Sequence, residues 1–271
     1  MAPRFERLRR VTWGSMNGAD GENTAHDSPS RRLIRRAWYV HIFTTSGVVV
    51  GMMALEAIFT GKPRAAIAYL LITQLIDGID GPMARQIDIR AVVPKLDGYI
   101  LDLVIDYVTC VVVPAAFMHQ FGLLPSRFSL ATAGLVVFLS AMWFSRTDMM
   151  TEDHWFNGFP ATWNLVAPSL YLMQTSKWIN LGLVVLLSGL MLTNAKFPHM
   201  VRAAAAREIT LPVTGVWLLT LAYATTRTTH SRASTAILIA VFIYFTGLSV
   251  WRSRFCKSGV TLPTNQVAGS T

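Results

Sequence analysis

The sequence predicts an all-α, polytopic membrane protein with about eight transmembrane helices and both chain ends in the cytoplasm. Apolar residues make up 52% of the 271 residues and charged residues only 14%, whereas soluble domains carry about 25% charged residues. Apolar runs that approach the roughly 20 residues of a membrane span recur along the chain. Basic residues gather in alternate connections between these runs, as cytoplasmic loops require.

The eight apolar runs are separated by short connections, and prolines lie in or beside these connections, where they are expected. The runs cover residues 38–60, 65–84, 98–118, 128–145, 160–175, 178–194, 211–226 and 234–251. The fifth to seventh runs are short, so their ends are the least well defined. An even number of spans puts both chain ends on the same side of the membrane.

Charge indicates which side that is. With both ends in the cytoplasm, 18 of the 24 Lys and Arg residues fall in cytoplasmic segments and 6 in outer loops. This bias follows the positive-inside rule. The chain then divides into a polar, basic cytoplasmic segment (1–37), a transmembrane domain (38–251) and a cytoplasmic tail (252–271). The arginines at 31–36 could form an interfacial helix on anionic headgroups or act only as topology anchors.

Several classes of protein are disfavoured. The net charge of +9 fits topology and anionic lipid better than nucleic acid, because no nucleic-acid-binding motif accompanies it. Cys110 and Cys256 lie in unrelated surroundings, so no disulfide framework is expected. The sequence contains no secretory signal peptide, Walker loop, dinucleotide fingerprint or paired-histidine metal motif.

Four aspartates interrupt the second and third apolar runs. Asp77 and Asp80 end one run, and Asp102 and Asp106 begin the next. These spacings put each pair on one face of a helix. Ionisable residues inside a membrane indicate a functional site, although any one aspartate alone could be a solvated helix end. If the helices pack side by side, the carboxylates converge, and their repulsion calls for divalent cations.

These aspartates and the small residues around them resemble the signature of the CDP-alcohol phosphotransferases, D-x-x-D-G-x-x-A-R followed by G-x-x-x-D-x-x-x-D. The matching residues are Asp77, Asp80, Gly81, Ala84, Arg85, Gly98, Asp102 and Asp106. The spacer from Gln86 to Asp97 has twelve residues, more than in most members, and is similar to that of bacterial phosphatidylcholine synthases. Residues 41–47 and 158–164 also look like that subfamily, so the resemblance spans about residues 38–250.

The resemblance implies a CDP-alcohol phosphotransferase-like bundle in the bacterial inner membrane. The predicted topology puts the 85–97 connection in the cytoplasm, so the site is expected to open to that side. It implies transfer of the phosphatidyl group of CDP-diacylglycerol to choline with release of CMP, and it is consistent with a homodimer. Two Mn²⁺ or Mg²⁺ ions would be held by Asp77, Asp80, Asp102 and Asp106, with Asp106 also the general base.

Substrate contacts follow from the same signature and from residue chemistry. Gly81 and Ala84 would let cytidine lie against the helix, with Gly98 beside the CDP phosphates. Arg85 could pair with a phosphate or with a structural carboxylate. Thr44 and Ser46 could line this site or only pack helices. Choline cannot donate hydrogen bonds and calls for aromatic faces. Candidates are Tyr99, Trp155, Trp163 and Asn164, although aromatic residues at span ends also form interfacial belts. The 146–159 loop has more acidic than basic residues, which favours a cationic acceptor.

Two alternatives stay open. The same signature could serve another acceptor, namely serine, inositol or glycerol phosphate, of which the phosphorylated ones would call for more basic residues near the site. A cation- or proton-coupled transporter could also hold carboxylates in broken helices. A transport site, however, lies near the middle of the bilayer, whereas these aspartates are predicted towards one edge.

Overall fold

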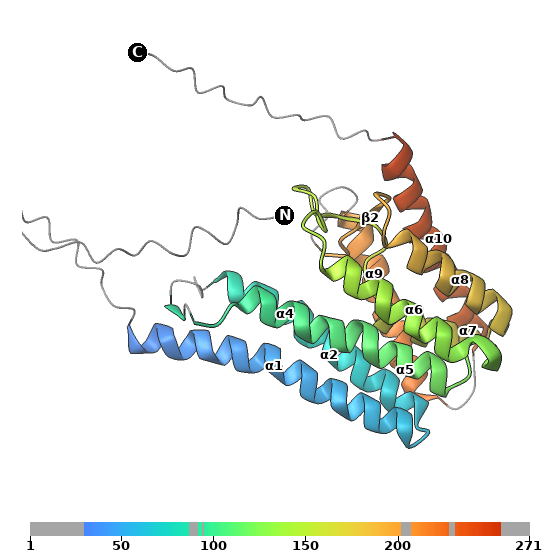
Figure 1. The fold of residues 1–271 in the computed structure, drawn as a ribbon, viewed down its shortest axis with the longest axis horizontal. Helices are drawn as coiled ribbons and strands as arrows, with labels where there is room; N and C mark the ends of the chain where they lie inside the picture. Colours follow the sequence, from blue (N-terminus) through green and yellow to red (C-terminus); the bar gives the residue numbers. More distant parts are fainter. Residues whose placement is uncertain (1–29, 87–91, 94, 202–206, 228–230, 256–271) are drawn as a thin grey trace, which may run out of the picture.

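A bundle of helices forms most of the protein, with one small two-stranded sheet at one end (Figure 1). The computed structural model describes residues 30–86, 92–93, 95–201, 207–227 and 231–255. The helices are α1 (Arg31–Phe59), α2 (Pro63–Arg85), α4 (Gly98–Asp106), the π-helical η2 (Tyr107–Val112), α5 (Val113–Gln120), α6 (Ser126–Phe144), α7 (Trp163–Met173), α8 (Lys177–Leu190), α9 (Arg207–Thr226) and α10 (Arg232–Phe255). Most of the predicted cytoplasmic segment 1–37 and tail 252–271 lies outside the described residues.

A helix occupies each of the eight predicted runs, and the third run is a continuous rod of α4, η2 and α5. Within the described residues, five segments are long and apolar enough to cross a membrane: α1, the rod, α6, α9 and α10. α2 has 23 residues but carries Asp77 and Asp80, and α7 and α8 have 11 and 14 residues. The prediction of an all-α integral membrane protein is confirmed, and the number of spans stays a prediction.

α1 and α2 form a helical hairpin, and the rod packs against it. The turn between them places Gly61 at a φ of 68°, a conformation that glycine adopts at little cost. The rod runs alongside α1 (Figure 1). A Cβ atom on Gly51 would lie only 3.1 Å from the Thr109 side chain, and one on Gly47 would lie 3.4 Å from Ile105. These two glycines therefore let α1 and the rod approach closely.

Helix α1 begins earlier than the first predicted run, which was expected to start at residue 38. The helix begins after Ser30, whose hydroxyl accepts a hydrogen bond from the Leu33 amide at 3.3 Å. The arginines at 31, 32, 35 and 36 are exposed. On the other face, Leu33, Ile34 and Ala37 form an apolar cluster with Val92, Val93 and Leu96. The basic turns and the apolar span are therefore one unbroken helix.

The small sheet is an element that the sequence analysis does not predict. Strands β1 (Trp155–Asn157) and β2 (Lys196–Pro198) pair in antiparallel fashion and join the loop after α6 to the segment after α8. Each strand has only three residues, too few for an alternating apolar pattern to be recognised.

Two arginines form ion pairs with acidic residues of the 146–159 loop, which lies beside this sheet. Arg146 donates to both carboxylate oxygens of Asp148, at 2.8 and 2.9 Å, and these hydrogen bonds hold the pKa of Asp148 below its ordinary value. Arg252 of α10 donates to Asp153 at 2.5 Å and lies over the Trp155 ring, 5.5 Å from its centroid. Two of the acids expected to favour a cationic acceptor are thus paired with arginine.

Gly158 yields a stability prediction. Its φ is 83°, and a Cβ atom there would lie 2.2 Å from the carbonyl oxygen of Met191. Gly158→Ala should therefore destabilise the protein by more than the roughly 1–3 kcal/mol of the backbone strain alone. The measurement is thermal unfolding of the purified protein in detergent. Gly182→Ala in α8 is the matched control, because its Cβ atom would meet nothing within 4 Å; equal melting temperatures for the two variants would contradict the prediction.

Candidate active site

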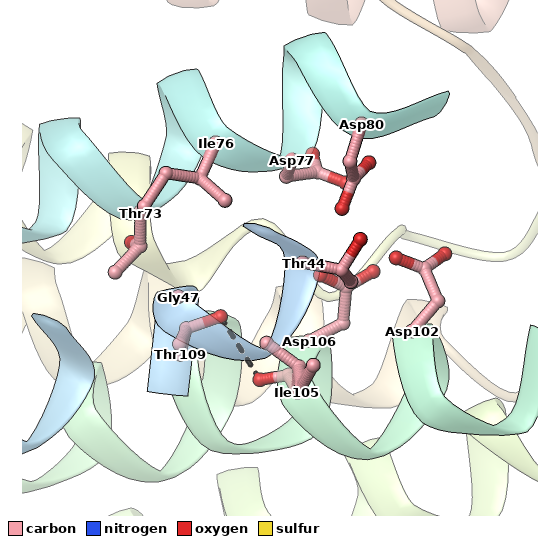
Figure 2. A pocket seen from close by; sticks show the side chains of 10 residues that line it. All are labelled: Thr44, Gly47, Thr73, Ile76, Asp77, Asp80, Asp102, Ile105, Asp106 and Thr109. Atoms are coloured by element: carbon pink, nitrogen blue, oxygen red, sulfur yellow. Dashed lines mark hydrogen bonds between the residues drawn. The ribbon is translucent and has the colours of Figure 1, made fainter. Parts of the chain in front are cut away.

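A polar hollow lies between α1, α2 and the rod. Figure 2 shows Asp77 and Asp80 reaching it from one helix and Asp102 and Asp106 from the facing helix, with Thr44 close by. The residues that line it are Thr44, Gly47, Thr73, Ile76, Asp77, Asp80, Asp102, Ile105, Asp106 and Thr109. The predicted convergence of the aspartates of the second and third runs is therefore present.

The sequence at the start of α4 sets the helical phase that turns Asp102 and Asp106 towards the hollow. Asp97 caps the helix by accepting from the amides of Tyr99 at 2.9 Å and Ile100 at 3.4 Å, a common way to begin a helix. Asp102 and Asp106 follow one turn apart on the face towards α2. Immediately after Asp106 the helix widens into η2. Such π-helical turns are frequent at functional sites.

Three of the carboxylates form a compact group. Asp77, Asp102 and Asp106 each offer an oxygen, and these three oxygens lie within 4.8 Å of one another. Two oxygens bound to one Mg²⁺ at about 2.1 Å lie at most about 4.2 Å apart, so only small side-chain movements would let them share an ion. Asp80 is 5% exposed and lines the same hollow, but it lies outside this group of three.

Other predicted nucleotide contacts lie around the hollow. Thr44 lines it, whereas the Ser46 hydroxyl bonds to the Phe43 carbonyl at 2.6 Å and is not among the lining side chains. Gly98 begins α4 against His41 of α1: a Cβ atom on Gly98 would lie 3.1 Å from the imidazole Cε1 atom. Gly81, Ala84 and Arg85 occupy the last turn of α2, beyond Asp80.

Three of the four choline-binding candidates are buried and contact other side chains. Trp155 is 1% exposed and lies beneath Arg252, and the fully buried Trp163 donates its indole N–H to Ser140 at 3.2 Å. Tyr99 lies at the start of α4 and is exposed. Asn164 is buried and donates to Gln74. An aromatic cage for the acceptor therefore stays a prediction.

Several lining residues were not identified from the sequence. Thr73 and Ile76 of α2 and Ile105 and Thr109 of the rod carry no functional signature in an apolar run. Gln74 was also missed, although its amide donates to Asp77 at 3.1 Å. Its position three residues before Asp77, on the same helical face, was the available signal.

The sequence matches the CDP-alcohol phosphatidyltransferase family over residues 39–195, which is more than half of the chain. The chain belongs to this family. The prediction made from the signature is thereby confirmed, and the match includes all eight signature positions.

Similarity to individual related proteins covers more of the chain than residues 39–195. A phosphatidylcholine synthase of Pseudomonas aeruginosa is 37% identical over 222 residues, covering 80% of this chain and 92% of that protein. A phosphatidylcholine synthase of Mesorhizobium japonicum is 32% identical over 227 residues, covering 84% and 82%. One of Borreliella burgdorferi is 31% identical over 221 residues, covering 79% and 93%.

Membership of the CDP-alcohol phosphatidyltransferase family makes the chain a transferase, so the transporter alternative is set aside. Members of this family use divalent metal, and the donor set of Asp77, Asp102 and Asp106 fits one because it consists of negatively charged oxygens. The lining residues of α2 run from Thr73 to Asp80 and those of the rod from Asp102 to Thr109. The hollow therefore extends from near the middle of both helices towards the end of α2 and the start of the rod.

The cluster predicts the effect of losing one carboxylate. Asp102→Asn should raise the Kd of the purified protein for Mn²⁺ at least about tenfold, because a neutral amide replaces a negatively charged ligand. Titration of free Mn²⁺ by electron paramagnetic resonance measures this directly. Asp148→Asn is the control, since this exposed carboxylate pairs with Arg146 outside the hollow. Unchanged Mn²⁺ binding by Asp102→Asn would exclude Asp102 as a ligand.

Proposed function

We propose that this protein is a phosphatidylcholine synthase, which converts CDP-diacylglycerol and choline into phosphatidylcholine and CMP. Two observations carry the proposal. Oxygens of three carboxylates lie within 4.8 Å of one another in the hollow. Family members named phosphatidylcholine synthase align with about four-fifths of this chain. The first supports the phosphatidyl transfer, and the second supports choline as the acceptor.

Asp77, Asp80, Asp102 and Asp106 are the proposed holders of divalent metal, either Mn²⁺ or Mg²⁺ and two ions in number. Bound there, the metal would neutralise the charge of the pyrophosphate oxygens and of the departing CMP. The half-buried position of the three clustered acids supports this role, because carboxylates so close together repel one another unless a cation lies between them.

Asp106 is the proposed general base. It would accept the proton of the choline hydroxyl while that oxygen forms a bond to the β-phosphorus of CDP-diacylglycerol. The bond from the β-phosphorus to the oxygen that bridges the two phosphorus atoms breaks, and CMP leaves with that oxygen and the bonding electron pair. Asp106 lines the hollow near Asp77 and Asp102, which supports the assignment.

The nucleotide is proposed to lie between α1 and the ends of α2 and α4. Gly81, Ala84 and Gly98 would allow close approach of the CDP group, with Arg85 available to its phosphates. Thr44 is supported by its place in the lining, and Ser46 has no such support. For the acceptor, Tyr99 is supported by its exposed ring, whereas Trp155, Trp163 and Asn164 are buried.

The location of the site is also a proposal. The bacterial relatives and the charge bias of the loops favour the inner membrane with the hollow open to the cytoplasm, where choline and divalent cations are available. CDP-diacylglycerol would come from the membrane itself, with its acyl chains in the bilayer. A homodimer is expected from the family resemblance alone.

A substrate comparison tests the acceptor. Purified protein in mixed micelles with CDP-diacylglycerol should form phosphatidylcholine from labelled choline and release equal CMP, and a chelator should abolish both. Serine, inositol and glycerol 3-phosphate should give no product, because their charge and hydrogen-bonding groups differ from those of a quaternary ammonium. Lipid product from serine without any from choline would overturn the acceptor assignment and leave the family intact.

Replacement of the proposed base tests the chemistry. Asp106→Asn should lower kcat by at least about a hundredfold, because a general base contributes roughly 10²–10⁴ to the rate. Binding of CDP-diacylglycerol, measured by calorimetry in the same micelles, should change much less. Wild-type turnover in this variant would exclude Asp106 as the base.

A further inference from the structure

A chain of two hydrogen bonds leads from the hollow to α7. The side-chain amide of Gln74 donates to the Asp77 carboxylate at 3.1 Å. The carbonyl oxygen of the same Gln74 side chain accepts from the Asn164 amide at 2.8 Å. Gln74 and Asp77 lie on α2, whereas Asn164 lies ninety residues further along the chain on α7. Neither amide lines the hollow.

The direction of this chain follows from Asp77. An ionised carboxylate can only accept hydrogen bonds, so Gln74 must turn its NH₂ group towards it. The Gln74 carbonyl then points away and needs a donor, and Asn164 supplies one with its own NH₂ group. Both amides are therefore oriented by the charge at the end of the chain.

The orientation leaves one polar atom unsatisfied. Asn164 is 1% exposed, and its Oδ1 atom is buried without a hydrogen-bond partner among the residues that the structure describes. A buried acceptor without a partner destabilises the folded state. An apolar residue would fill this position in the core without that cost, so what the asparagine contributes is the donor that it supplies to Gln74.

We propose that Gln74 and Asn164 are positioning residues, which hold the Asp77 carboxylate where it shares a cation with Asp102 and Asp106. The proposal rests on the metal site of the proposed function. Repulsion from Asp102 and Asp106 would turn the Asp77 side chain away from the group. The hydrogen bond from the Gln74 amide opposes that rotation, and the hydrogen bond from Asn164 fixes the Gln74 side chain. One Asp77 oxygen can accept from Gln74 while the carboxylate still offers lone pairs to the ion.

Gln74→Met and Asn164→Leu test this directly, because each keeps a similar volume and removes the donor. In the purified full-length protein, Gln74→Met should raise the Kd for Mn²⁺ by about 10–100-fold, as loss of a hydrogen-bonding partner of a metal ligand commonly does. Asn164→Leu should raise it less, since it acts through Gln74. Without metal, the melting temperature of Asn164→Leu should change little, because the removal of the unsatisfied Oδ1 atom is offset by the loss of the hydrogen bond to the Gln74 carbonyl.

The double variant separates a chain from two independent effects. Once Gln74 is replaced, no hydrogen bonds connect Asn164 to Asp77. The double variant should therefore bind Mn²⁺ as weakly as Gln74→Met alone. Ser169→Ala is the matched control on α7: it removes the hydroxyl that accepts from the Trp217 indole at 2.9 Å. This control should lower the melting temperature and leave the Mn²⁺ Kd unchanged.

Three results would overturn the proposal: wild-type Mn²⁺ affinity in both single variants, additive losses in the double variant, or no Mn²⁺ binding by the wild type itself. If Asn164→Leu does not fold, Gln74→Met still decides the first point. Because Mn²⁺ binding is measured without lipid or acceptor, a failure of choline as substrate leaves this inference standing. In the enzyme assay, Gln74→Met should raise the metal concentration needed for half-maximal activity and leave the KM for choline unchanged.

Discussion

The structure depends on the meeting of like charges inside an apolar bundle. Asp77 from α2 and Asp102 and Asp106 from α4 place oxygens within 4.8 Å of one another. Burial and mutual repulsion both oppose such an arrangement, so the surrounding helices must hold it in place. The close packing of α1 at Gly47 and Gly51 brings the rod against the α1–α2 hairpin, and the hollow is the space that these three helices leave between them.

The remaining helices form the support of this site. α7 lies in the core, where Trp163 donates to Ser140 and Ser169 accepts from Trp217. The arginine contacts of Arg146 and Arg252 fasten the loop after α6 to the segments that follow α8 and to α10. The proposed link through Asn164 would connect this rigid part to the Asp77 carboxylate. Catalytic groups held in this way lose less entropy when the substrate binds.

Much of this arrangement was predictable from residue spacing. Apolar runs of nearly span length located the helices, and three- and four-residue spacings placed Asp77 with Asp80 and Asp102 with Asp106. The small sheet was not predictable, because strands of three residues leave no periodic pattern. Nor was η2, because a widened helical turn depends on packing around Tyr107–Val112 rather than on residue type.

Local sequence alone thus determined the helical class, the membrane environment and the identity of the acids, because hydropathy and helical periodicity act over short distances along the chain. Tertiary structure decided which side chains those acids meet. Asn164 reaches Asp77 through Gln74, and Trp155 lies under Arg252. Gln74 and Asn164 are 90 residues apart in the chain, and Trp155 and Arg252 are 97 apart. Such contacts follow from how the helices pack, and no spacing within either segment encodes them.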